Sequence, residues 1–122
     1  MKKKFGIAMT AMLLMALGFT SCSSEKPSDV VMAYLNAVKE EKFDEAMSYM
    51  EGDEDDINRF SYHLRSMSTK EIDFYKEGKV TILEEEIDGE KARVKVSIET
   101  EDDSDRDNYY LNKVDGKWKI HL

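Results

Sequence analysis

The chain has 122 residues, of which 26 are acidic and 18 are basic, so its formal net charge at pH 7 is −8. A protein this acidic is repelled by the phosphates of nucleic acids and by anionic lipid headgroups. We therefore exclude nucleic-acid binding, and we expect any membrane association to come from an attached lipid and not from a basic surface.

The first 21 residues have the parts of a secretory signal. Lys2, Lys3 and Lys4 form a cationic start, and an apolar run follows over residues 5–19. This run is shorter than the ~20 residues that a membrane-spanning helix needs. The sequence thus predicts a cleaved signal over residues 1–21 and not a membrane-spanning anchor.

Cys22 is the only cysteine, and two small residues, Thr20 and Ser21, stand directly before it. This arrangement resembles the lipobox of bacterial lipoproteins. The resemblance implies cleavage after Ser21 and acylation of Cys22, so that residues 22–27 form the lipidated cysteine and a short tether. Two or more acyl chains anchor a protein stably, whereas one holds it only marginally. The alternative is an ordinary secretory signal with an unrelated cysteine nearby.

The residue after the cysteine bears on the location of the protein. In lipoproteins, retention at the inner membrane usually uses an aspartate at this position, and here the residue is Ser23. The resemblance therefore implies sorting to the outer membrane of a bacterial cell envelope. Since no acidic run follows Cys22, we expect the protein to face the periplasm and not the cell surface.

Residues 28–122 are enough for a single domain with one modest core. Ser28 is a predicted helix N-cap. The apolar residues after it recur at helical intervals: Val30, Val31, Tyr34, Leu35 and Val38. A second helix is predicted over residues 43–50, with Gly52 as its C-terminal stop. A third helix is predicted from the spacing of Ile57, Phe60, Leu64 and Met67.

The second half of the chain has the pattern of strands. Apolar and polar residues alternate over residues 92–98, and Asp-Gly pairs at 88–89 and 115–116 are typical of hairpin turns. Helices come first and an antiparallel meander follows. This order predicts an α+β fold with the N-terminal helices packed on one face of an antiparallel sheet.

The register of the last hairpin follows from its apolar residues. A two-residue loop at Asp115 and Gly116 places Lys113 opposite Trp118. One face of the hairpin then carries the apolar residues Tyr109, Leu111, Trp118, Ile120 and Leu122. A slip of one residue would scatter them over both faces, so the sequence predicts this register.

Two registers compete for the first hairpin. A two-residue loop at Asp88 and Gly89 pairs Glu84 with Arg93, which suits their charges. A three-residue loop with Gly89 in a bulge instead places Val80 and Ile82 opposite Val96 and Val94. We favour the bulged loop, because burying two more aliphatic side chains contributes about 3 kcal/mol or more, against under ~1 kcal/mol for an exposed ion pair.

The start and the end of the domain together resemble a known superfamily. Pro27-Ser28-Asp29 leads into a helix with an apolar stripe, Phe43-Asp44-Glu45-Ala46 opens a second helix, and the chain closes on Asp115-Gly116-Lys117-Trp118-Lys119-Ile120. Over residues 27–122 this is similar to the nuclear transport factor 2-like superfamily, in particular its small lipoprotein domains of unknown function. The resemblance implies a cystatin-like cone, in which a strongly curved antiparallel sheet wraps around the helices and leaves a pocket.

The superfamily contains enzymes, such as ketosteroid isomerase and dehydratases, as well as non-catalytic members, so the fold alone does not decide the function. We favour a binding or accessory module that takes a small apolar ligand or a protein partner. A small cavity enzyme of lyase or isomerase type is the first alternative. A structural subunit whose polar sheet face pairs with a partner is the second, and the oligomeric state stays open.

No residue is assigned to catalysis or to a cofactor. The candidate residues for lining a pocket or the core are Tyr34, Tyr109, Leu111, Trp118 and Ile120, with core packing preferred for each tyrosine and for Trp118. His63 and His121 are far apart and have no metal-ligand spacing. Asp103, Asp105 and Asp107 match the start of a calcium loop, but the turn glycine and the closing glutamate are missing, so we expect no requirement for calcium.

Overall fold

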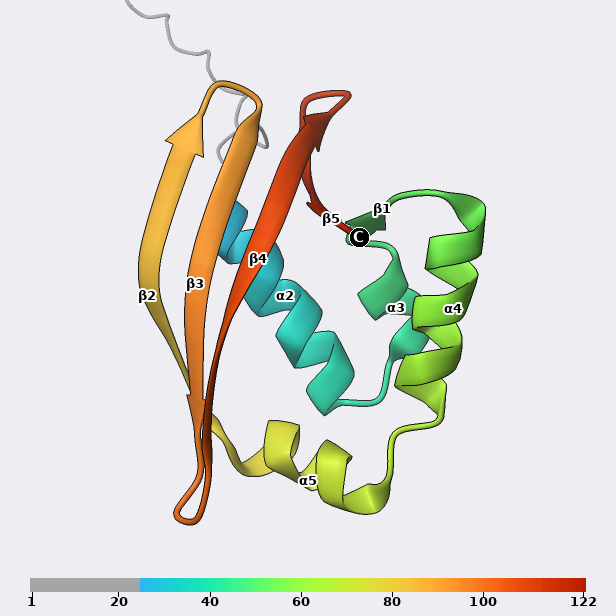
Figure 1. Ribbon diagram of the computed structural model, residues 1–122, viewed down its shortest axis with the longest axis vertical. Helices are drawn as coiled ribbons and strands as arrows, with labels where there is room; N and C mark the ends of the chain where they lie inside the picture. The colour runs from blue at the N-terminus through green and yellow to red at the C-terminus, as the bar shows by residue number, and fades with distance from the viewer. Residues whose placement is uncertain (1–24) are drawn as a thin grey trace, which may run out of the picture.

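The computed structural model describes residues 25–122, so the predicted signal segment and Cys22 lie outside the described residues. Within this part of the chain, helices come first and five strands then form one curved, open sheet, as Figure 1 shows. The elements are α2 (Pro27–Lys39), α3 (Phe43–Met47), β1 (Met50–Glu51), α4 (Glu54–Arg65), α5 (Thr69–Glu77), β2 (Lys79–Asp88), β3 (Lys91–Glu99), β4 (Ser104–Val114) and β5 (Lys117–His121). The strand order is β1-β5-β4-β3-β2, antiparallel except for the parallel pair β1–β5. The predicted α+β class, with helices on one face of a curved sheet, is confirmed.

The core lies between α2 and the concave face of the sheet. Val31 and Val38 of α2 are fully buried, as is Val94 of β3. These residues belong to one cluster that also contains Leu111, Trp118 and Ile120. The helical spacing of α2 and the alternation of β3 therefore meet in a single core, because each pattern places its apolar residues on one face.

The start of α2 differs from the prediction. Ser28 is not the N-cap: the helix begins at Pro27, and Lys26 occupies the cap position. Proline suits the first helical position because its φ angle is already helical and its missing N–H would have no partner there. The free N–H groups find carboxylates elsewhere, since Lys26 N donates to Asp29 Oδ2 (3.0 Å) and Ser28 N donates to Glu85 Oε2 of β2 (2.9 Å).

Two other helices also differ from the prediction. The second helix ends at Met47, and Met50 lies instead in β1, where it pairs with Ile120 of β5. Helix α5 was not predicted. Its start carries a capping box: Ser68 Oγ accepts from Glu71 N (3.2 Å), and Ser68 N donates to Glu71 Oε1 (2.9 Å). The second helix is therefore shorter than its periodicity indicated, and α5 is an additional helix that contacts α2.

The last hairpin has the predicted register. Leu111 pairs with Ile120, and Lys113 pairs with Trp118 across the turn at Asp115 and Gly116. Trp118 is buried, with 7% of its surface exposed. The Lys113 ammonium lies 5.4 Å from the centroid of the Trp118 ring, so a cation–π contact covers the outer side of the indole.

Both registers considered for the first hairpin are wrong. Asp88 pairs with Lys91, so the loop consists of Gly89 and Glu90, and a register shift follows at residue 83. The irregularity at residue 83 allows both the aliphatic pairing and the ion pair of Arg93, since an extra residue changes which side chains face the core. Ile82 pairs with Val96, while Arg93 donates from Nη2 to Glu84 (2.8 Å) and from Nε to Glu86 (3.3 Å) on the other face.

The junction of β1 with β5 contains an ion pair that predicts a pH dependence. Burial raises the pKa of Glu51, but hydrogen bonds from Asn112 and His121 outweigh it and lower the pKa below its usual 4.5. A lowered pKa in the folded state stabilises the domain above the unfolded value, and this contribution is lost as the pH falls through the folded pKa. We expect acid unfolding below about pH 4.5 to be less steep in Glu51→Gln than in the wild type, as measured by circular dichroism; equal slopes would contradict this.

Candidate functional site

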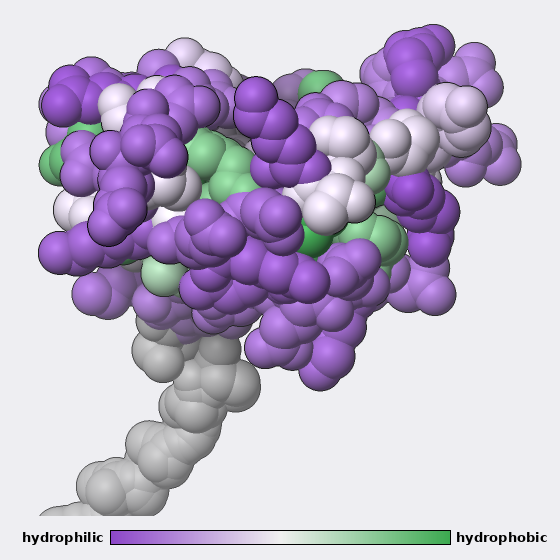
Figure 2. Space-filling model, turned by 90° about the horizontal axis from the view of Figure 1, so that it is seen from below, coloured by the Kyte–Doolittle hydropathy of each residue, from purple (hydrophilic) through white to green (hydrophobic). Residues whose placement is uncertain are grey.

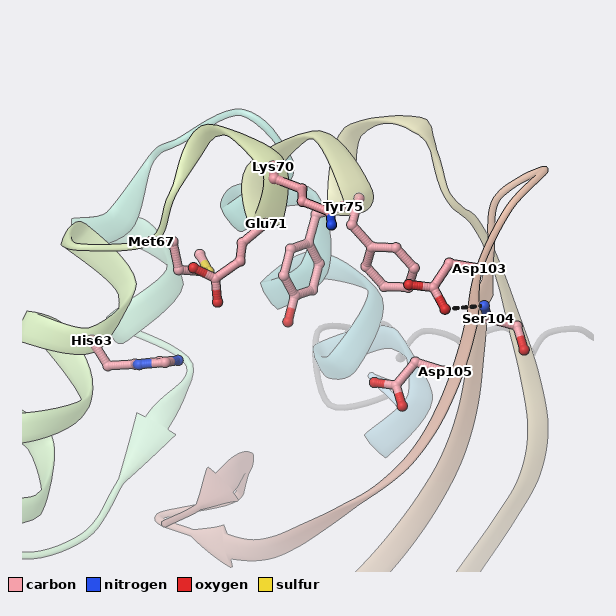
Figure 3. A pocket seen from close by; sticks show the side chains of 9 residues that line it. His63, Met67, Lys70, Glu71, Tyr75, Asp103, Ser104 and Asp105 are labelled. Carbon is pink, nitrogen blue, oxygen red and sulfur yellow. Dashed lines mark hydrogen bonds between the residues drawn. The ribbon is translucent and has the colours of Figure 1, made fainter.

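A cleft of about 490 Å³ lies at the end of the molecule where α4, α5 and the start of β4 meet (Figure 3). Its walls come from three segments: the C-terminal half of α4, the length of α5, and the residues that lead into β4. The residues that line it are His63, Met67, Lys70, Glu71, Phe74, Tyr75, Asp103, Ser104 and Asp105. The cleft is thus built from parts of the chain that are far apart in the sequence.

Tyr75 is the central side chain of the cleft. Figure 3 shows its ring pointing into the space, with Glu71 on one side and Asp105 on the other. Phe74 packs beside it edge to face, with the ring centroids 5.9 Å apart. The capping box fixes the start of α5, and the helix turn then presents Glu71 and Tyr75 on the same side of the helix. An aromatic floor flanked by carboxylates results.

Behind Tyr75, a small cavity of about 20 Å³ leads toward the core. It is lined by Val96, Ile98, Asp105, Asp107, Tyr109 and Tyr75 itself. Tyr109 packs edge to face on Tyr34, with the ring centroids 6.0 Å apart. Burial raises the pKa of all three tyrosines, and the neighbouring tyrosine or aspartate charges raise it further. Their hydroxyls therefore stay protonated and can donate hydrogen bonds at neutral pH.

The charge around the cleft is mainly negative. Glu71, Asp103 and Asp105 bring carboxylates to it, against one lysine, Lys70, and one histidine, His63. The hydrogen bonds that Glu71 receives at Ser68 lower the pKa of its carboxyl, so this group stays ionised. Figure 2 views this end of the molecule and shows a largely hydrophilic surface with small apolar areas between. The site is an acidic cleft with an aromatic floor.

A family model described as a domain of unknown function, DUF4878, matches residues 20–121. The chain belongs to this family. No curated protein matches the sequence.

Two crystal structures resemble the fold of this DUF4878 domain. A protein described as a putative NTF2-like transpeptidase from Campylobacter jejuni has 21% sequence identity and a TM-score of 0.60, over 80% of this chain and 99% of that one. An NTF-2 like protein of unknown function from Shewanella oneidensis MR-1 has 14% identity and a TM-score of 0.51, over 77% of this chain and 93% of that one. The predicted nuclear transport factor 2-like fold is confirmed, and at these identities the likeness concerns the fold alone.

The residues predicted to line a pocket or the core lie in or against the core of the DUF4878 domain and not in the acidic cleft. Leu111, Trp118 and Ile120 are buried, and Tyr34 is 4% exposed. Tyr109 is half-buried and reaches the small cavity behind Tyr75.

The sequence does not predict a binding site at the residues that form this cleft. The sequence allows Tyr75 to face a pocket but favours a core-edge position for it, and His63, which has no metal-ligand spacing, lines the wall. His121 instead contacts Glu51 at the β1–β5 junction. The signal that could have found the site is the capping box at Ser68, which predicts α5 and, by helical spacing, places Glu71 and Tyr75 together.

The three aspartates with calcium-like spacing, Asp103, Asp105 and Asp107, do not face one common site. Asp103 accepts a hydrogen bond from the backbone of Ser104 (2.9 Å), while Asp105 and Asp107 face the small cavity. Within residues 25–122, no group of three or more acidic, histidine or cysteine side chains is arranged to hold a metal ion. That calcium is not required stays a prediction.

Between residues 25 and 122, none of the helices combines the length and apolar character that a membrane crossing needs.

Proposed function

We propose that the chain is a lipid-anchored binding module of the bacterial cell envelope, held at the outer membrane on the periplasmic side, and that the acidic cleft is its binding site. The anchor is supported by the resemblance of residues 17–24 to a lipobox, with Cys22 as the acylated residue. The binding role is supported by an open cleft of about 490 Å³, which is within the size range of small-molecule sites.

The chemistry of the cleft favours a ligand that combines a positive charge with an apolar part. Tyr75 and Phe74 offer ring surface, and a cation over an aromatic face is stabilised by the ring's electron density. Asp105 and Glu71 stand on either side of Tyr75, so an ammonium group lying there would find carboxylates as well. The single observation that carries this proposal is the aromatic floor flanked by carboxylates, seen in Figure 3.

The carboxylates at and beside the cleft are accessible from solvent. Asp103, Asp105 and Asp107 are all exposed. They are therefore suited to attract a cation.

The anchor is tested by Cys22→Ser. The thiol is the only one in the chain, so this variant has no cysteine to acylate. We expect it to accumulate as an unacylated precursor that incorporates no radioactive palmitate, whereas the wild type is labelled. Ser23→Ala is the matched control and should be labelled like the wild type. Undiminished labelling of Cys22→Ser would refute the anchor.

The ligand chemistry is tested with 2-phenylethylammonium, which has one ring and one positive charge. We expect Asp105→Asn to weaken its binding roughly two- to fivefold, the loss of one exposed charge pair, as measured by chemical-shift titration. Asp88→Asn makes the same charge change at the other end of β2 and should leave the affinity unchanged. Phenylacetate, of similar shape and opposite charge, should not bind. Equal losses in both variants, or equal binding of both probes, would contradict a cation site.

A further inference from the structure

The end of the domain opposite the cleft is where the predicted lipid tether joins it. The β2–β3 turn at residues 88–91 and the β4–β5 turn at residues 114–117 lie at this end, and α2 begins behind the sheet in the half of the molecule nearer to these turns, as Figure 1 shows. We call this the tethered end. Hydrogen bonds join its parts: Lys113 N donates to Glu90 O (2.8 Å), and Ser28 N donates to Glu85 of β2. The start of α2 is therefore fixed against the sheet near these two turns.

The tether is short compared with the domain. Cys22 lies five positions before Pro27, so these residues span at most about 18 Å. The strand β3 has 9 residues, which gives it a length of about 30 Å between the tethered end and the turn beside the cleft. A domain attached through Cys22 thus has its tethered end within reach of the lipid headgroups.

The tethered end carries most of the large apolar side chains that are exposed within residues 25–122. Ile87 is 54% exposed, Tyr110 is 56% exposed and Val114 is 38% exposed. Ile87 and Tyr110 also line the same shallow hollow beside Lys91 and Arg93. Tyrosine and lysine are suited to a membrane interface, because each has an apolar body and a polar tip.

The charge of the molecule is distributed unequally between its ends. The two turns of the tethered end, residues 88–91 and 114–117, contain three acidic residues and two lysines, a net charge of −1. Residues 99–107, beside the cleft, contain six acidic residues and one arginine. Anionic headgroups therefore repel residues 99–107 more strongly than they repel the two turns. The electrostatic field of the headgroups and the short tether therefore favour the same orientation of the domain.

From these three observations we infer that the tethered end is a membrane-docking surface, which rests flat on the bilayer that holds the acyl chains and points the cleft into the compartment. This inference rests on the lipid anchor proposed above. Ile87, Tyr110 and Val114 enter the headgroup region, and the lysines of the two turns reach the phosphates. The cleft then stands about 30 Å from the headgroups and is open to soluble ligands.

The orientation is tested with the full acylated protein on vesicles of phosphatidylethanolamine and phosphatidylglycerol. An environment-sensitive nitrobenzoxadiazole dye is attached to a single introduced cysteine, Val114→Cys or Ile87→Cys, and to Asp103→Cys beside the cleft as the matched control. Acylation blocks the Cys22 thiol, so only the new cysteine reacts. We expect blue-shifted emission and strong quenching by headgroup-labelled doxyl lipid at positions 114 and 87, and neither effect at 103.

Equal emission and equal quenching at the three positions would overturn the docking surface, as would quenching at position 103 alone. A failure of the anchor looks different: the protein then has an unmodified mass at Cys22 and does not float with the vesicles. Flotation without a difference between the labels contradicts the orientation and leaves the anchor standing. The two variants at the tethered end also guard against one of them failing to fold.

Discussion

Replacing Trp118 with alanine is expected to lower the free energy of unfolding by about 3–5 kcal/mol. The indole is 7% exposed and belongs to the same core cluster as Leu111 and Ile120. The substitution leaves a cavity between the last hairpin and the helices, and it also removes the ring under the Lys113 ammonium. Such a loss is a large share of the ~5–15 kcal/mol that a domain of this size has.

Urea unfolding followed by circular dichroism measures this loss. Tyr62→Ala is the matched control, because Tyr62 is 75% exposed on α4 and its replacement should change the stability by no more than about 0.5 kcal/mol. In the wild type, the fluorescence of Trp118 should be blue-shifted and poorly quenched by iodide. Since Trp118 lies outside the cleft, 2-phenylethylammonium should leave this emission unchanged. A red-shifted, freely quenched emission would show that the hairpin register is wrong.

Replacing Gly78 with alanine is expected to cost about 1–3 kcal/mol by overpacking. Gly78 connects α5 to β2, and a Cβ atom there would lie 2.4 Å from Cγ2 of Ile98 and 2.7 Å from the carbonyl oxygen of Phe74. The backbone at Gly78 has φ −71° and ψ 140°, a conformation that alanine adopts readily. The cost therefore comes from the contacts and not from the dihedral angles.

Two comparisons separate this clash from other effects of the substitution. Glu77→Ala, one position earlier and exposed, should be nearly neutral. In an Ile98→Ala background, which lacks the Cγ2 atom, the penalty of Gly78→Ala should become smaller. Because α5 carries Glu71 and Tyr75, Gly78→Ala should also weaken the binding of 2-phenylethylammonium. An unchanged stability would contradict the close approach of Gly78 to Ile98.

The sequence predicts the fold class and the last hairpin because their signals are local. Alternation on β4 and β5, with an Asp-Gly turn between them, leaves only one register that keeps Leu111, Trp118 and Ile120 on one face. The same local signals do not predict the register of the first hairpin. Its register depends on an irregularity at residue 83. This irregularity lets Arg93 contact Glu84 and Glu86 on one face, and on the other it lets Glu85 accept a hydrogen bond from the start of α2.

The candidate site was less predictable than the fold, since it depends on how distant segments meet. No periodicity indicates that α5 stands opposite the start of β4, so the nearness of Tyr75 to Asp105 appears only in three dimensions. Met50 shows the same limit: its spacing suits a helix, and its pairing with Ile120 makes it a strand residue. Cys22 is the reverse case, because its signal lies wholly in the sequence around it.

A native mass spectrum of the protein purified from its own cell envelope tests the lipid anchor and the binding site together. It reports covalent lipid and bound ligand on the same molecule. We expect a chain that begins at Cys22 and carries the mass of its acyl chains. It should also hold a small ligand with a positive charge and an apolar part, whose occupancy is lower in Asp105→Asn and unchanged in Asp88→Asn. A chain with an unmodified Cys22 would contradict the anchor, and an acylated chain that retains the same ligand in both variants would contradict the acidic cleft as the binding site.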